Sequence, residues 1–111
     1  MLKNKHIFLK KKILIYGLGK SGLSTYHYLK KNNFLYLFDD KNINFKNIEI
    51  KKRLIKYNKI SKNKFDRIII SPGIDLNKCK LSKYLKKNLS RVNTDLDIFY
   101  YFCPLNKNIT I

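Results

Sequence analysis

Three glycines with the spacing G-x-G-x-x-G follow an apolar run near the beginning of the chain. They are Gly17, Gly19 and Gly22, within the stretch YGLGKSGLS. In this pattern the first glycine permits a tight turn, the second lets the backbone approach an anion, and the third lets a helix pack closely on a sheet. The helix that follows offers N–H groups and a partial positive charge at its N-terminus. The pattern predicts a loop that binds a phosphate-bearing ligand, and a tight strand-to-helix turn without a ligand is the alternative.

Two adjacent aspartates stand where such a loop usually finds an acidic partner. Asp39 and Asp40 follow the apolar run FLYLF, about 20 residues beyond the loop. In a dinucleotide-binding protein this acid holds ribose hydroxyls, and it could equally bind the edge of a uracil or another base. No neighbouring residue suggests a reaction, so we do not interpret the two carboxylates as a general acid and base. Exposed turn residues are the structural alternative.

A Ser-Pro-Gly turn closes a later apolar run. Residues 68–74 read IIISPGI, so Ser71, Pro72 and Gly73 come directly after a predicted buried strand. Open α/β sheets bind their ligands beyond the carboxyl ends of the strands. Pro72 stiffens the turn, and Gly73 allows close approach of the backbone. The turn is therefore a further candidate for ligand contact at this edge.

The elements that must position these residues alternate between strands and helices. Short apolar runs predict buried parallel strands at residues 12–16, 34–38 and 65–70. A helix is expected over residues 21–31, which carry apolar and aromatic side chains at helical spacing. Those side chains are Leu23, Tyr26, His27 and Leu29. The alternation indicates an α/β fold, a Rossmann-like open parallel sheet with helices on both faces.

The second half of the chain continues this pattern less clearly. Residues 41–47 are polar loop, and residues 48–60 are a mixed segment without a clear period. Asn77 is a candidate cap for a helix over residues 78–88, with Leu81, Tyr84 and Leu85 on one face. A brief strand is expected at residues 89–92, a short helix from Thr94 or Asp95 through Phe102, and another strand at residues 108–111.

The chain is 111 residues long and strongly basic. Its 25 lysines and arginines stand against 7 acidic residues, which gives a net charge of +18. Such a surplus is typical of proteins that bind nucleic acid or anionic membranes. Only Arg53, Arg67 and Arg91 are arginines, however, and the lysines are spread along the chain rather than gathered on one motif. We attribute most of the charge to a composition biased toward Lys, Asn and Ile, and we do not expect a nucleic-acid partner.

The remaining composition predicts a cytoplasmic protein without a metal site. Cys79 and Cys103 form no C-x-x-C pair, and His6 and His27 have no partners at ligand spacing. We therefore expect free thiols in a reducing compartment. No apolar stretch approaches the ~20 residues that a membrane span needs, so no membrane partner is expected.

Four stretches of the chain, in this order and spacing, resemble a known family. They are KILIYGLGKSGLSTYHYL, LFDDK, FDRIIISPGI and RVNTDLDIFYYF, and they are similar to the N-terminal domain of the Mur ligases that add D-glutamate in peptidoglycan synthesis. The resemblance covers nearly the whole chain, from about residue 11 to its end. It implies a Rossmann-like domain that binds the UDP part of UDP-N-acetylmuramoyl-L-alanine.

The resemblance also assigns roles to individual residues. It implies that Lys20 and Ser21, in the glycine loop, contact the uracil. Asp39, Asp40 and Lys41 would complete the uracil pocket, and Gly73 would lie beside the diphosphate. Together with Gly17, Gly19, Ser71 and Pro72, these residues form the predicted binding site for the UDP moiety, and no catalytic residue is assigned.

The family's architecture implies further domains. Residues 1–107 would be the substrate-binding domain, and residues 108–111 the first strand of a missing central ATPase domain. A C-terminal domain that positions the incoming amino acid would be missing as well. ATP and Mg²⁺ are expected for the full-length enzyme and not for this chain, which has no G-x-x-x-x-G-K-[ST] loop. The chain alone is expected to bind the nucleotide sugar without catalysing ligation. The alternatives are an NAD(P)-binding module of an oxidoreductase or regulator and, on charge alone, a small nucleic-acid-binding protein.

Overall fold

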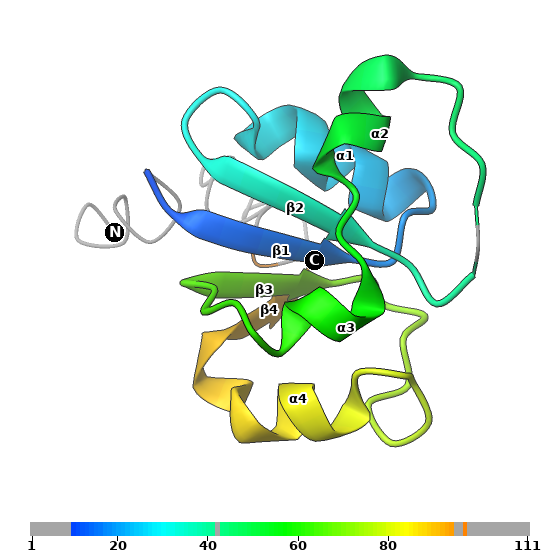
Figure 1. Cartoon of the computed structure of the whole chain (residues 1–111). Coiled ribbons are helices and arrows are strands. Elements are labelled where there is room, and N and C mark those ends of the chain that lie inside the picture. The colour runs from blue at the N-terminus through cyan, green and yellow to red at the C-terminus, as the bar shows by residue number, and fades with distance from the viewer. Residues whose placement is uncertain (1–9, 42, 95–96, 98–111) are drawn as a thin grey trace, which may run out of the picture.

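A parallel β-sheet with helices on both faces forms the centre of the molecule (Figure 1). The computed structural model describes residues 10–41, 43–94 and 97. Within these residues, the strands lie in the order β2-β1-β3-β4, and every pairing is parallel. The strands are β1 (Lys12–Tyr16), β2 (Phe34–Phe38), β3 (Arg67–Ile70) and β4 (Val92–Thr94). This arrangement confirms the Rossmann-like open sheet that the sequence predicts.

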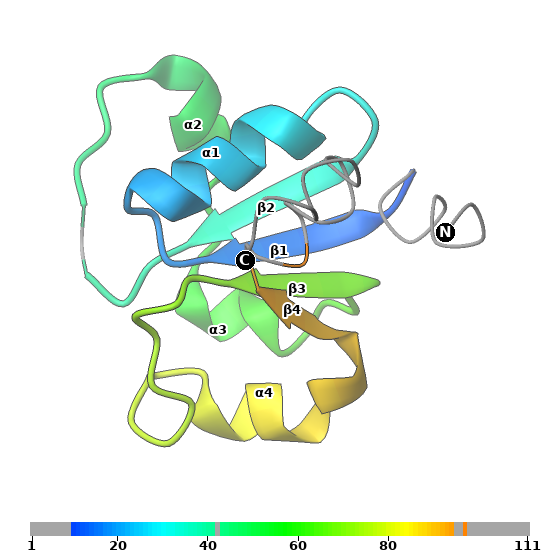
Figure 2. The same ribbon diagram turned by 180° about the vertical axis from the view of Figure 1, so that it is seen from behind.

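The alternation of side chains along the strands divides the core into two layers. Ile13 and Ile15 of β1 belong to a cluster under α1 (Lys20–Leu29), whereas Leu14 and Tyr16 belong to a cluster under α3 (Tyr57–Ile60) and α4 (Ser82–Lys87). Figure 2 shows α1, with α2 beside it, away from α3 and α4. Because both faces are covered, the strands read as continuous apolar runs.

The helix α1 lies between a glycine N-cap and an asparagine that anchors its C-terminal end. Gly19 is its N-cap residue, and Gly22, Thr25, Tyr26 and Leu29 are its buried residues. At the other end, the Asn33 amide nitrogen donates to the Leu29 carbonyl at 3.0 Å, and its amide oxygen accepts from the backbone N–H of Lys11 at 3.0 Å. His27, which the sequence places on the apolar stripe, is exposed; that part of the prediction is wrong.

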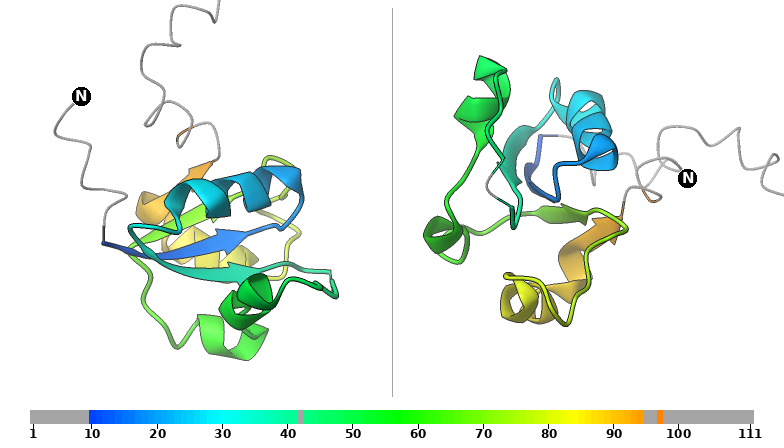
Figure 3. Two further views of the ribbon diagram at one scale, coloured as in Figure 1. Left: turned by 90° about the horizontal axis from the view of Figure 1, so that it is seen from above. Right: turned by 90° about the vertical axis from the view of Figure 1, so that its right-hand side faces the viewer.

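The mixed segment at residues 48–60 forms two short helices joined by an extended stretch. Asn47 caps α2 (Ile48–Arg53) by accepting from the backbone N–H of Ile50 at 3.1 Å. Leu54 then forms a parallel bridge with Leu37, and the Ile55 N–H donates to the Leu37 carbonyl at 2.9 Å. This stretch covers the outer edge of β2, with α2 beside it (Figure 3).

The expected helix over residues 78–88 is shorter than predicted. Asn77 does not cap it, because the Asp75 carboxylate accepts from the Asn77 N–H at 2.9 Å and the Asp75 carbonyl accepts from the N–H groups of Lys78 and Cys79. These bonds close a turn, so α4 begins at Ser82, with Leu81 as its cap residue. Leu81 and Leu85 are buried as predicted.

The strand expected at residues 89–92 begins later than predicted. Leu89–Arg91 is a 3₁₀ turn, in which the Arg91 N–H donates to the Asn88 carbonyl at 2.9 Å. The pairing with β3 then joins Val92 to Ile68 and Thr94 to Ile70. The helix expected through Phe102, the strand at residues 108–111 and the boundary between the two predicted domains lie outside the described residues.

Candidate ligand-binding site

Three loops meet at the carboxyl edge of the sheet, on the right of Figure 1. The N–H of Gly17, just after β1, donates to the Phe38 carbonyl at the end of β2, at 2.8 Å. Ser71, just after β3, donates its backbone N–H to the Tyr16 carbonyl at 3.1 Å and its hydroxyl to the Gly17 carbonyl at 3.0 Å. The structure therefore brings the glycine loop, the aspartates and the Ser-Pro-Gly turn together, as their positions after neighbouring parallel strands predict.

Two of the three loop glycines are required by the packing of the chain itself. Gly17 has a φ of +99°, and a Cβ there would lie 2.6 Å from the Ser71 hydroxyl oxygen. A Cβ on Gly22 would lie 1.8 Å from the Gly17 carbonyl oxygen. These distances are far below van der Waals contact, so Gly17 permits the turn and Gly22 permits the close packing of α1, the roles that the motif predicts.

The third loop glycine, Gly19, is different. It is exposed, and a Cβ there would meet no heavy atom within 4 Å. Lys20 beside it is also exposed, and Ser21 is half-buried at the first turn of α1. Since α1 has no acidic residue in this turn, the positive end of the helix dipole faces the loop without a neighbouring carboxylate on the helix. This is a suitable position for a phosphate.

Asp39 ties the end of β2 to the glycine loop. One of its carboxylate oxygens accepts from the backbone N–H of Leu18 at 2.7 Å, and the other accepts from the N–H of Lys41 at 2.8 Å. The side chain is half-buried. A carboxylate can accept further hydrogen bonds at its remaining lone pairs. Asp39 therefore holds the loops of the site in place, and a ligand that binds its carboxylate must do so alongside the N–H groups of Leu18 and Lys41.

Asp40 has a different set of partners, which sequence reasoning did not identify. It accepts from the Tyr16 hydroxyl at 2.5 Å and from the backbone N–H of Lys80 at 3.3 Å. Tyr16 is fully buried. Burial, together with the hydrogen bond to Asp40, raises the pKa of Tyr16 well above its ordinary value, so the phenol remains a donor. A tyrosine ending an otherwise aliphatic buried strand is the signal in the sequence, because a buried hydroxyl needs a partner.

A cavity of about 390 Å³ opens beside the aspartates. Asp39, Asp40 and Lys41 line it together with Phe38 and Tyr57, whose ring centroids are 6.2 Å apart. Its volume lies within the range of small-molecule sites. The glycines, Lys20, Ser21 and the Ser-Pro-Gly turn do not line this cavity. The predicted site thus has two parts. One is this cavity, lined by aromatic and acidic residues, and the other is the more exposed glycine loop next to it.

The Ser-Pro-Gly turn presents its backbone at the open side of the edge. The Ile74 N–H donates to the Ser71 carbonyl at 3.0 Å, which closes the turn. Pro72 and Gly73 are exposed, and a Cβ on Gly73 would meet nothing within 4 Å. The Ser71 hydroxyl already donates its hydrogen bond to the Gly17 carbonyl. Gly73 is therefore open to a ligand, whereas Ser71 holds two loops together.

The described part of the chain can be compared with the requirements of a metal cluster and of a membrane-spanning helix. Its His, Cys, Asp and Glu side chains form no group of three or more that could hold a metal ion. Cys79 is a free thiol. None of the helices at residues 10–41 and 43–94 combines the length and the apolar character needed to cross a bilayer.

A parallel sheet in this order, with a glycine loop after β1 and an acidic residue after β2, defines a Rossmann-like domain, and the carboxyl edge of the sheet is its candidate site. Comparison with known families narrows this class. The family described as Mur ligase MurD-like, N-terminal domain matches residues 11–93. The chain belongs to this family of Mur ligase N-terminal domains.

Several curated relatives carry the same name, UDP-N-acetylmuramoylalanine–D-glutamate ligase. The protein of Rickettsia bellii is 30% identical over 97 residues, which covers 85% of this chain and 21% of the relative. The proteins of Caldicellulosiruptor saccharolyticus and Caldicellulosiruptor bescii are 29% and 34% identical and cover 89% of this chain, with 24% and 23% of their own lengths matched. The chain thus spans between a fifth and a quarter of these relatives. No solved structure matches it with statistical significance.

Proposed function

We propose that the chain binds UDP-N-acetylmuramoyl-L-alanine as the N-terminal domain of a D-glutamate-adding ligase of peptidoglycan synthesis. The family membership and the convergence of three loops at the carboxyl edge support this proposal. The comparisons give no support to the alternative, an NAD(P)-binding module of an oxidoreductase or regulator. The reaction belongs to the cytoplasm in this proposal.

The geometry supports a division of the substrate between the two parts of the site. The cavity beside Asp39, Asp40 and Lys41 offers aromatic rings and acceptors, which suit a uracil. The diphosphate is proposed to lie along the backbone of Gly19 and Gly73, where no side chain obstructs it. The first turn of α1 and the exposed Lys20 supply positive charge there.

The sequence lacks the phosphate-binding loop of ATPases, and this supports placing ATP outside the chain. We propose that ATP and Mg²⁺ belong to a central domain of the full-length enzyme, and that this chain positions the nucleotide sugar for it.

Calorimetric titration of the chain at about 150 mM salt, where exposed charges are screened beyond ~8 Å, tests the proposal. UDP-N-acetylmuramoyl-L-alanine is expected to bind with saturation, and NADH is not. Lys20→Ala is expected to weaken binding, whereas Lys31→Ala, also exposed and beyond the other end of α1, removes the same charge without effect. Binding of NADH without binding of the UDP compound, or binding of neither, contradicts the proposal.

A further inference from the structure

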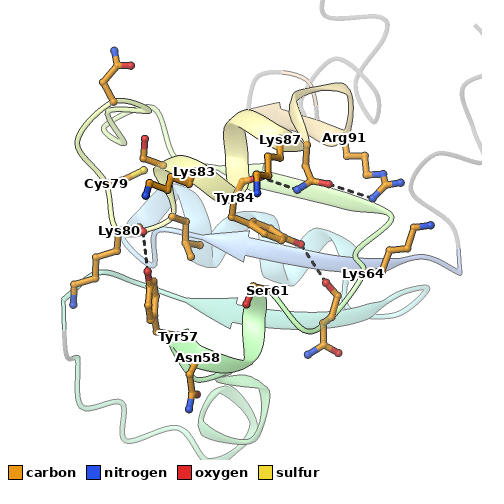
Figure 4. A pocket seen from close by; sticks show the side chains of 15 residues that line it. Tyr57, Asn58, Ser61, Lys64, Cys79, Lys80, Lys83, Tyr84, Lys87 and Arg91 are labelled. Carbon is orange, nitrogen blue, oxygen red and sulfur yellow. Dashed lines mark hydrogen bonds between the residues drawn. The ribbon is translucent and has the colours of Figure 1, made fainter.

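A second and larger cavity lies between α3 and α4 (Figure 4). Its volume is about 890 Å³, near the upper end of the range for small-molecule sites. Its lining includes five cationic residues and no acidic residue. The cations are Lys64, Lys80, Lys83, Lys87 and Arg91. It shares only Tyr57 and Lys80 with the smaller cavity beside the aspartates, so it is a separate site.

Two tyrosines hold the opposite sides of this cavity together. The Tyr57 hydroxyl of α3 donates to the Lys80 carbonyl at 3.4 Å, and the Tyr84 hydroxyl of α4 donates to the Asn63 carbonyl at 3.4 Å. Both contacts are drawn in Figure 4. Burial raises the pKa of Tyr84, so its hydroxyl remains a donor at neutral pH. These two long contacts link opposite sides of the cavity.

The guanidinium of Arg91 contacts a neighbouring polar side chain. One of its nitrogens donates to the Asn88 side-chain oxygen at 3.4 Å. Asn88 in turn donates its amide to the Tyr84 carbonyl at 2.7 Å, which anchors it to α4. The planar fork of a guanidinium matches two phosphate oxygens, so Arg91 is a suitable phosphate ligand in this cavity.

The positive charge of the cavity is not balanced by the protein. In the described part of the chain, no carboxylate lies within 4.0 Å of these five cations; the ion pair found there joins Lys30 to Glu49, which do not line the cavity. Lys83 and Lys87 are four residues apart on α4, where like charges repel. A bound anion would relieve that repulsion and would find several cations within one hollow.

We propose that this cavity binds an oligophosphate of two or three phosphoryl groups, either free or as part of a nucleotide. The volume suits a small molecule rather than a nucleic-acid duplex, and lysine and arginine side chains are suitable phosphate ligands. Figure 4 shows Lys80 and Lys64 at opposite ends of the lining, so Lys83, Lys87 and Arg91 are the principal cations of this proposal. The exposed ring of Tyr57 offers an apolar surface for a base. Tyr57 also lines the cavity proposed for the uracil, so a bound nucleotide base would compete with the uracil for its ring, whereas Lys64, Lys83, Lys87 and Arg91 belong to this cavity alone.

Inorganic tripolyphosphate is the probe for the first experiment, titrated into the full chain by calorimetry and by amide NMR at about 150 mM salt. We expect saturable one-to-one binding with shifts confined to residues 57–64 and 80–91. The double variant Lys83→Gln/Lys87→Gln is expected to lose at least about tenfold in affinity, equivalent to about 1.4 kcal/mol. The control Lys51→Gln/Lys52→Gln removes the same charge from two exposed positions of α2 and is expected to bind like the wild type.

Equal losses in the two double variants would show a general charge effect and overturn the proposal, as would the lack of saturable binding. Lys20→Ala leaves this binding unchanged if the cavity is the site, which separates the result from that of the proposed substrate site. Adenosine and uridine triphosphates distinguish the source of the ligand. Tighter binding of either than of tripolyphosphate identifies a nucleotide site, and equal binding identifies a site for free oligophosphate.

Discussion

The close approach of α1 to the glycine loop predicts that Gly22→Ala strongly destabilises the fold. A Cβ at this position would lie 1.8 Å from the Gly17 carbonyl oxygen and 2.9 Å from its carbonyl carbon. Cβ atoms essentially never approach below 3.0 Å, so α1 and the loop must separate by roughly 1.2 Å. The obstacle is backbone, and the Ser71 hydroxyl and the Phe38 carbonyl hold it in place.

The magnitude follows from two opposing effects. Alanine favours a helix over glycine by ~1 kcal/mol, which would stabilise α1 if the space existed. Overpacking typically costs about 1–3 kcal/mol, and a forced movement of α1 also loosens the packing of the buried Tyr26 and Leu29, which adds roughly 2 kcal/mol. We expect a net loss of about 2–4 kcal/mol in the free energy of unfolding.

Urea unfolding followed by far-ultraviolet circular dichroism measures this loss. Gly73→Ala is the matched control, because its Cβ would meet nothing within 4 Å and its φ lies outside the left-handed region. We expect that control to stay within about 0.5 kcal/mol of the wild type. If Gly22→Ala is equally neutral, the inferred contact between α1 and the loop is wrong.

Two further substitutions test the polar contacts of the core and its margin. Tyr16→Phe removes the hydroxyl that donates a hydrogen bond to Asp40. We expect the free energy of unfolding, measured in urea, to fall by about 1–2 kcal/mol; an unchanged stability would show that this hydrogen bond contributes nothing. The hydrogen bond from Tyr26, followed by the charge of Lys30, lowers the pKa of Glu49 below its ordinary value. A depressed carboxyl pKa stabilises the fold above the unfolded pKa, and this contribution is lost as the pH falls through the folded pKa. Lowering the pH from about 6 to about 3 should therefore lower the melting temperature of the wild type more than that of Glu49→Gln. Parallel pH dependences of the two melting temperatures would contradict this.

The first half of the fold follows closely from the sequence. Its strands at Lys12–Tyr16 and Phe34–Phe38 have the predicted bounds, because each is a short apolar run covered on both faces and bounded by polar or glycine residues. The glycine spacing likewise fixes the turn into α1, since steric contacts at Gly17 and Gly22 leave little freedom.

The second half depends on contacts that a one-dimensional pattern does not contain. Asn77 looks like a helix cap, but the Asp75 carboxylate takes its N–H and forms a turn instead. The residues after Asn47 form a helix because Asn47 caps it, and they then become extended because Leu37 offers a free edge. Local propensity is weak at these positions, and tertiary contacts decide the outcome.

The candidate site shows the same division. The positions of Asp39 and Asp40 after β2 predict that they lie at the sheet's carboxyl edge, and they do. Their hydrogen-bond partners could not be predicted, because Lys80 lies 40 residues from Asp40 and reaches it only through the fold. The assignment of these residues and of the glycine loop to UDP binding stays a prediction.

The unequal surroundings of the three loop glycines bear on how such motifs change over evolutionary time. Gly17 and Gly22 are fixed by contacts inside the chain, whether or not a ligand is ever bound. If the domain no longer bound a substrate but still had to fold, selection would retain both Gly17 and Gly22. Gly19 faces open space, and its place as the N-cap of α1 could equally be taken by Ser, Thr, Asp or Asn, so a ligand that approaches the backbone is the main reason to retain glycine there. Among orthologues, drift at position 19 with invariant glycines at 17 and 22 would mark lineages that keep the scaffold after losing the substrate.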